Sequence, residues 1–198
     1  MMDFFQVLQT RRSIYAIGDQ AMVPYERLLE VLKVVIEATP SAFNSQSQRM
    51  VLLRGDAHLR FWQIVIEALR TTVSEKQRLR TERKIAAFAA GYGTLLFFDD
   101  QEVTNNLKRQ FPQYQDNFGI WYQQHAGMLQ INIWNALADL GYGASLQHYN
   151  ELIEPLVKQT FKIPNTWQLL AQMPFGNIVE SALKKDIMPF EKRFKIIE

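Results

Sequence analysis

The stretch V-P-Y-E-R-L-L-E-V-L-K-V-V-I-E-A-T-P-S-A-F-N-S-Q-S-Q-R-M-V-L-L-R-G, residues 23–55, contains a helix, a polar loop and a strand in succession. Apolar residues at positions 28, 29, 32, 35 and 36 have the spacing of one helix face, and Pro40 ends that pattern. The run M-V-L-L-R-G is short, apolar and closed by glycine, which predicts a strand. The loop between them, residues 39–49, is crowded with hydroxyl and amide side chains and is therefore a candidate binding loop.

Helical and strand-like patterns continue to alternate along the rest of the chain. The first expected elements are a short amphipathic helix before Arg11, a helix with Asp56 as N-cap that reaches Leu69, and a helix over 75–90. A buried strand T-L-L-F-F follows, then polar irregular surface with at most a short helix over 99–114, and a long apolar helix over 120–140 closed by Gly141. The last expected elements are a helix over 151–161, a turn at 164–165, a strand over 167–176 and an extended piece F-K-I-I. This order predicts helices packed on a sheet, in an α/β or α+β fold.

The composition sets limits on the class of protein. The 198 residues are 47% hydrophobic and carry a net charge of only +2, which predicts one globular domain, 1–198, and gives no sign of a nucleic-acid or membrane partner. The chain has no cysteine, so disulfides and thiolate sites are excluded and a cytoplasmic location is the default expectation. No apolar run approaches the roughly 20 residues that span a bilayer.

Several common motifs are missing or have a simpler explanation. No G-x-G-x-x-G follows a predicted strand, and there is no P-loop. His58, His125 and His148 lack metal-ligand spacing, so we expect no metal site and interpret them as hydrogen-bonding residues. The basic run K-Q-R-L-R-T-E-R-K alternates with glutamate and reads as a solvated helix face.

Four polar pieces together suggest a nucleotide-like ligand. They are Arg11-Arg12-Ser13, the amides of the 39–49 loop, the glycine-bearing segment 141–150, and the basic residues near the C-terminus. Arginine offers a fork of donors for phosphate, while amide side chains and backbone N–H groups satisfy the edge of a heterocyclic ring. The simpler alternatives are cations that stabilise a helix C-terminus, turn residues that satisfy their own loop, and a helix cap at Gly141.

The motifs R-R-S-I-Y (11–15), P-S-A-F-N-S-Q-S-Q-R (40–49), G-Y-G-A-S-L-Q-H-Y-N (141–150) and M-P-F-G (173–176) occur in this order. With them the chain resembles the FMN-dependent nitroreductase family from end to end, and most closely the branch of the fatty-acid-repression-type nitroreductases. The resemblance implies an α+β, nitroreductase-like fold with a mixed, mainly antiparallel central sheet flanked by helices in an intertwined homodimer. It also implies FMN at the dimer interface, NADH or NADPH as electron donor, and reduction of nitroaromatic or quinone-like acceptors by a ping-pong mechanism.

The resemblance also assigns residues. The flavin carries the chemistry, so no catalytic side chain is expected. Arg11, Arg12 and Ser13 would hold the FMN phosphate and ribityl chain, the 41–46 loop would line the isoalloxazine, and segment 143–146 would lie near the ring. The expected cofactor-binding residues are Arg11, Arg12, Ser13, Tyr15, Ser41, Ala42, Phe43, Asn44, Gln46, Gly143, Ala144, Ser145, Leu146, Lys185 and Arg193.

Two departures from the family pattern bear on this assignment. Tyr15 stands where many members have a lysine or arginine, and Ser47-Gln48-Arg49 replaces the usual Pro-Trp-like continuation. Two rival functions remain on the sequence alone. One is a flavin-binding protein that senses redox state or regulates stress or lipid responses with little turnover. The other is a cofactor-free interaction protein that uses an aromatic dimer face.

Overall fold

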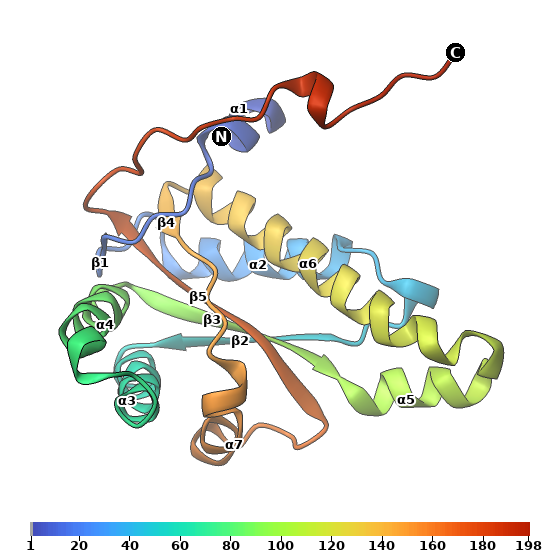
Figure 1. Cartoon of the computed structure of the whole chain (residues 1–198), viewed down its shortest axis with the longest axis horizontal. Helices are drawn as coiled ribbons and strands as arrows, with labels where there is room; N and C mark the ends of the chain where they lie inside the picture. The colour runs from blue at the N-terminus through green and yellow to red at the C-terminus, as the bar shows by residue number, and fades with distance from the viewer. Residues whose placement is uncertain (1) are drawn as a thin grey trace.

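The computed structural model describes residues 2–198, which form a five-stranded antiparallel sheet covered on both faces by helices (Figure 1). The elements are α1 (Phe4–Thr10), β1 (Ile17–Gly18), α2 (Tyr25–Ala38), η1 (Ala42–Asn44), β2 (Gln48–Arg54), α3 (Asp56–Arg70), α4 (Glu75–Ala89), β3 (Gly93–Asp100), α5 (Gln101–Gln110), η2 (Pro112–Tyr114), α6 (Gln115–Asp139), β4 (Tyr142–Ala144), α7 (Asn150–Phe161), β5 (Trp167–Ile178) and η3 (Phe190–Lys192). The fold is α+β, as the sequence predicted.

The strand order β1-β5-β3-β2 places the longest strand, β5, inside the sheet, and β4 also pairs with β5. Every strand pair is antiparallel, and β3 matches β2 residue for residue from Gly93 opposite Arg54 to Asp99 opposite Gln48. All eight residues of β3 are buried, because helices cover this central strand on both faces.

Two apolar cores lie on the two faces of the sheet. One joins α3, α4 and α7 to the sheet through residues such as Trp62, Phe88 and Val157. The other joins α2 and α6 to the opposite face through residues such as Leu28 and Ile133. Figure 1 shows the resulting layers, with α2 and α6 on one side of the sheet and α3, α4 and α7 on the other.

Most predicted elements are present, and the differences have physical causes. Gly55, with φ of +54°, is the N-cap of α3, and Asp56 is the first helical residue instead of the cap. The long helix begins five residues earlier than predicted, at Gln115. The F-K-I-I piece joins no strand within the described chain.

The largest difference concerns the segment predicted as polar irregular surface. Asp99 and Asp100 extend β3 and are only 1% and 9% exposed, and the next ten residues form helix α5. The short helix is thus present, but the surface placement of Asp99 and Asp100 was wrong. Besides local donors from residues 101, 102 and 104, each carboxylate has a partner from far along the chain, Ser47 for Asp99 and Arg49 for Asp100.

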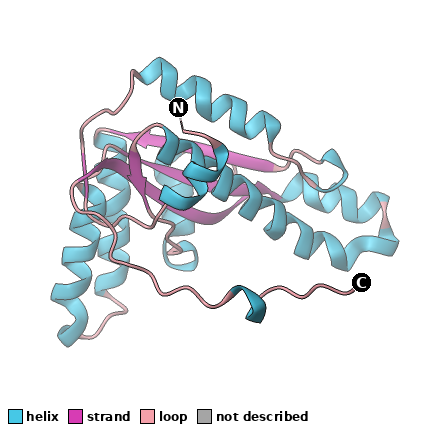
Figure 2. Ribbon diagram, turned by 90° about the horizontal axis from the view of Figure 1, so that it is seen from above, coloured by secondary structure: helices cyan, strands magenta, loops and turns pink. Residues whose placement is uncertain are grey.

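The C-terminal segment after β5 leaves the body of the molecule. It runs away from the sheet, and the C-terminus lies outside the body of the molecule (Figures 1 and 2). Several of its apolar side chains are almost fully exposed, including Leu183 (86%) and Ile197 (83%). We call residues 179–198 the C-terminal arm.

Candidate functional site

Six of the fifteen predicted cofactor-binding residues line two separate hollows, three in each. The first, which we call the arginine hollow, has a volume of about 440 Å³ and is lined by Arg12, Ser13, Tyr15, Ala16 and residues 180–184 of the C-terminal arm. Arg12 Nη2 donates a hydrogen bond to the Leu183 carbonyl oxygen at 2.6 Å, which joins the first motif to the arm. A guanidinium and a hydroxyl in one hollow are the groups that bind a phosphate ester.

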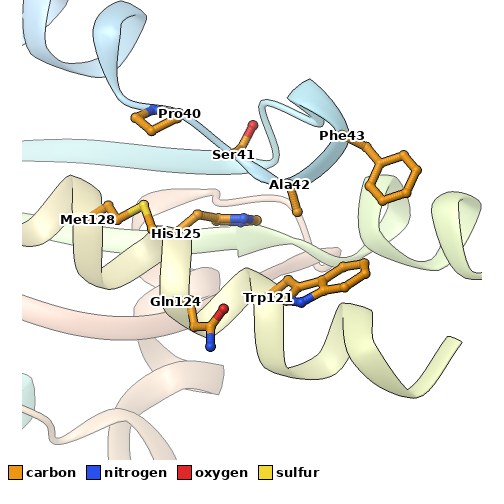
Figure 3. Close-up of a pocket in the computed structure, with 8 residues that line it drawn as sticks. All are labelled: Pro40, Ser41, Ala42, Phe43, Trp121, Gln124, His125 and Met128. Atoms are coloured by element: carbon orange, nitrogen blue, oxygen red, sulfur yellow. The ribbon is translucent and has the colours of Figure 1, made fainter. Parts of the chain in front are cut away.

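The second hollow, which we call the aromatic cavity, lies between the 40–43 loop and helix α6. It has a volume of about 330 Å³ and is lined by Pro40, Ser41, Ala42, Phe43, Trp121, Gln124, His125 and Met128. Figure 3 shows the loop on one side and α6 on the other, with Trp121 and His125 on the side of α6 that faces the loop and Gln124 pointing away from it. Because most of these side chains are apolar and two are aromatic, the cavity suits a flat ring.

The backbone of the loop is unusual. Phe43, Asn44 and Gln46 all have φ near +50°, the left-handed region that non-glycine residues seldom adopt. The half-exposed Phe43 ring contacts the rings of Phe111 and Phe118, with centroids 4.9 and 5.4 Å away. The loop therefore has a defined and strained shape that tertiary contacts maintain.

The fold brings the first motif next to the glycine-bearing segment. Ser13 and Ala144 form a parallel bridge, and the Ile14 amide donates to the Ala144 carbonyl oxygen at 2.9 Å. Gly143 has no room for a side chain, since a Cβ would lie 2.8 Å from Ile14 Cγ2 and 2.9 Å from Ile178 Cγ1. This glycine is needed for the close packing of the chain.

The remaining residues predicted in this segment point inward. Ser145 is buried and its Oγ accepts a hydrogen bond from Gln147 Nε2 at 3.1 Å, while Leu146 packs against the core around α6. Neither lines one of the two hollows.

Of the predicted cations, only Arg12 lines one of the two hollows. The Arg11 guanidinium lies over the Trp134 ring on α6, 4.6 Å from its centroid, and lines a smaller hollow beside Trp134. Burial lowers the pKa of Arg11 from its usual value, and the neighbouring Arg12 charge lowers it further. Lys185 and Arg193 lie exposed on the C-terminal arm and line neither hollow.

One cation near the arginine hollow was not predicted as a site residue. Lys84 Nζ lies 5.6 Å from the Phe88 ring centroid and 5.9 Å from that of Tyr149, and the Tyr15 ring packs on Phe88 at 6.3 Å. Partial burial of the Lys84 ammonium lowers the pKa of Lys84, and the positive charge of Arg80 lowers it further. Much of the Lys84 side chain is nevertheless exposed. The i, i+4 spacing of Lys84 and Phe88 was visible in the sequence, but the proximity of Tyr15 and Tyr149 was not.

Burial raises the pKa of Tyr149 to about 12, with a smaller contribution from Tyr15. The phenol of Tyr149 therefore stays neutral at physiological pH. Tyr15, Lys84 and Tyr149 together give this part of the site one ammonium group and two phenol hydroxyl groups.

A second missed group lies behind the loop. Ser47 Oγ is 2.5 Å from Asp99 Oδ1 and 3.1 Å from His125 Nε2, and the same ring nitrogen is 3.4 Å from Asp99 Oδ1. A nucleophilic triad needs serine and aspartate at opposite nitrogens of the ring and an accessible hydroxyl. Here both contact Nε2 and Ser47 is fully buried, so the group is a structural network and not a hydrolase site.

Within residues 2–198, no three or more histidine, aspartate or glutamate side chains are arranged to hold a metal ion. Over the same residues, no helix combines the length and the apolar composition that a membrane crossing requires.

The class of protein follows from the match of residues 8–177 to the Nitroreductase family. The chain belongs to this family and is an oxidoreductase. Its sheet and helices agree with that fold throughout.

Two Saccharomyces cerevisiae proteins are similar to this chain in sequence. HBN1, assigned as a nitroreductase, is 35% identical over 175 residues, which is 87% of this chain and 86% of HBN1. The nitroreductase FRM2 is 33% identical over 194 residues, which is 97% of this chain and 93% of FRM2.

The chain is also similar to a solved nitroreductase, CinD from Lactococcus lactis. In its complex with chloramphenicol CinD superposes with a TM-score of 0.91 at 39% identity, covering 99% of this chain and 100% of CinD. CinD has also been solved with 4-nitrophenol. A more distant protein from Desulfovibrio desulfuricans, solved with FMN, shares the fold at 18% identity, with a TM-score of 0.73 over 100% of this chain and 98% of that protein.

Proposed function

We propose that the protein is an FMN-dependent oxidoreductase that uses NADH or NADPH to reduce nitroaromatic or quinone-like acceptors by a ping-pong mechanism. The observation that carries the proposal is that three of the predicted flavin residues line a cationic hollow and three others line an apolar, aromatic one. FMN has the same two parts, a phosphate and a flat ring.

The chain's own residues fit the two ends of FMN. Arg12 and Ser13 would bind the phosphate in the arginine hollow, since guanidinium and hydroxyl groups donate to its oxygens. Ala42 and Phe43 would face the ring, and the left-handed Asn44 and Gln46 offer amide groups for its polar edge. Bound FMN would supply the redox chemistry, taking electrons from the nicotinamide and passing them to the acceptor.

Lys84 is proposed to supply the positive charge that Tyr15 does not. The ammonium lies near the rings of Phe88 and Tyr149, and the Tyr15 ring packs on Phe88. Charges beside such rings are screened less than charges in bulk water. A cation there would stabilise the negative charge of a reduced flavin.

A homodimer would join the two hollows into one site. On a single chain the arginine hollow and the aromatic cavity share no lining residue. The C-terminal arm exposes large apolar side chains, among them Leu183, Ile187 and Ile197, as expected of a segment that packs on a second copy. We propose that the 40–46 loop of one copy meets the arginine hollow of the other.

The test begins with the visible absorption spectrum of the purified protein and the mass of any chromophore released on denaturation. The expected result is an oxidised flavin spectrum with FMN released, bleached by NADH or NADPH without oxygen and restored by 4-nitrophenol. A protein that takes up no FMN would refute the proposal that FMN is its cofactor. Bound FMN without steady nicotinamide oxidation in the presence of a nitroaromatic would favour a regulatory flavoprotein.

A further inference from the structure

The loop that we propose to face the flavin must be held in its strained conformation by other parts of the molecule. Asparagine is enriched in the left-handed region, but phenylalanine and glutamine are not, so Phe43 and Gln46 need support from outside the loop. Within the loop, the Gln46 amide donates to Ser41 Oγ at 2.9 Å, which closes a turn but does not fix it to the sheet.

The attachment to the sheet comes from Ser47, where the loop enters β2. Its hydroxyl donates to Asp99 Oδ1 at 2.5 Å, and its carbonyl oxygen accepts from the Asp100 amide at 2.9 Å. Ser47 is therefore held through both its side chain and its backbone at the end of β3.

Asp99 is a fixed acceptor, because its other oxygen is also occupied. Oδ2 accepts from Gln101 Nε2 at 2.8 Å and from Thr104 Oγ1 at 2.7 Å. The carboxylate is 1% exposed, and a buried carboxylate with its lone pairs directed at fixed donors has little freedom to move.

The network also reaches the wall of the aromatic cavity. The single Ser47 hydroxyl hydrogen is directed to Asp99, so Ser47 Oγ accepts from His125 Nε2–H at 3.1 Å. His125 belongs to α6 and lines the aromatic cavity. The loop, the sheet and α6 therefore meet at one buried hydroxyl.

The residues that depart from the family continuation make further attachments. Gln48 Nε2 donates to the Pro40 carbonyl oxygen at 3.2 Å, at the start of the loop. Arg49 Nη1 donates to the Gln46 carbonyl oxygen at 2.6 Å, while its Nη2 pairs with Asp100 Oδ2 at 3.0 Å. Both ends of the loop are thus tied to the β2–β3 edge.

We propose that Asp99 is the positioning residue of this loop, and that through the Ser47 hydroxyl it holds the three left-handed residues ready for the flavin ring before the ring binds. The inference rests on the proposed function, because it deepens the account of the same site. Its first test needs no flavin.

Ser45 provides a matched control for Ser47. Its hydroxyl is buried in the same loop but has no hydrogen-bond partner within the described residues, so Ser45→Ala removes the same atom without breaking a bond. Amide hydrogen exchange is measured over residues 41–47 in the flavin-free full-length wild type, Ser47→Ala and Ser45→Ala. We expect about tenfold faster exchange in Ser47→Ala only. Equal exchange in the two variants would overturn the proposal.

Flavin binding separates positioning from a general loss of stability. If FMN binds, Ser47→Ala should raise its dissociation constant about fivefold to tenfold and shift the visible bands of the bound flavin, and Ser45→Ala should change neither. A Ser47→Ala protein with wild-type affinity and bands would overturn the positioning role. If none of the three proteins binds FMN, the proposed function fails and the exchange result still decides whether the Ser47 hydroxyl holds the loop.

A wild-type measurement covers the case in which Ser47→Ala does not fold. A hydroxyl hydrogen held between Ser47 Oγ and Asp99 Oδ1 is shielded from water and should give a slowly exchanging NMR signal with contacts to His125. A Ser47 hydroxyl that exchanges as fast as those of exposed serines would overturn the proposal.

Discussion

Replacing Gly176 with alanine should destabilise the protein more than a single methyl group normally does. Gly176 lies in β5, at the point where β1 and β4 both approach that strand. A Cβ there would overlap the Gly18 carbonyl oxygen and lie 2.9 Å from the Tyr92 amide nitrogen and 3.1 Å from the Gly18 carbonyl carbon. All three neighbours are backbone atoms, so no side-chain rotation can relieve the overlap.

The expected loss of stability follows from the displacement of β1 that the added methyl group requires. Strand β1 has to shift away from β5, which disturbs the pairing of Ile17 with Ile178 and the hydrogen bond from the Val179 amide to Ala16. Overpacking a tight interior costs about 1–3 kcal/mol, and each lost hydrogen bond adds about 1 kcal/mol. We expect the free energy of unfolding to fall by about 2–4 kcal/mol, a large part of a typical total of about 5–15 kcal/mol.

The assay is equilibrium urea unfolding followed by tryptophan fluorescence, with Gly119→Ala as the control. A Cβ at Gly119 in α6 would meet nothing within 4 Å, and alanine is favoured over glycine inside a helix by about 1 kcal/mol. The control should therefore be as stable as the wild type or slightly more stable. A Gly176→Ala protein within 1 kcal/mol of the wild type would refute the reasoning about the close approach of β1.

Three further outcomes are expected. Lys84→Gln should lower the reduction potential of bound FMN, whereas Lys76→Gln, at an exposed position of the same helix, should leave it unchanged; equal potentials would contradict the role of Lys84. Burial lowers the pKa of His58 from 6.5, and a backbone hydrogen bond to Ala89 only partly opposes this shift. Because the pKa is lower in the folded state, the unfolded state binds more protons. The stability that His58 contributes is present above pH 6.5 and is lost as the pH falls toward the pKa of the folded state, by at most about 1.4 kcal/mol per pH unit. Urea unfolding of His58→Gln at several pH values should lack this loss. FMN at a free concentration 100 times its dissociation constant should stabilise the folded protein by about 2.7 kcal/mol, measured as a rise in Tm, and riboflavin at the same concentration should stabilise it less if Arg12 binds the phosphate.

Local patterns in the sequence determined most of the secondary structure. The periodic run before Pro40 became α2, the M-V-L-L run became β2, and T-L-L-F-F became part of the buried strand β3. Apolar spacing predicts such elements because it records which face of a helix or strand is buried. The ordered motifs indicated the nitroreductase family, which the match over residues 8–177 confirmed. The individual site residues remain predictions.

Only the tertiary structure decided which polar residues are buried and which cations lie near the site. The sequence predicted Asp99 on the surface because a carboxylate is normally solvated, yet donors from residues 47, 101 and 104 replace its water. Lys84 reads as part of a solvated helix face, yet the fold places it against Tyr149. Sequence periodicity reports whether a residue faces inward or outward. Some of the partners that stabilise a buried charge, such as Ser47 for Asp99, lie far away along the chain, and only folding brings the two together.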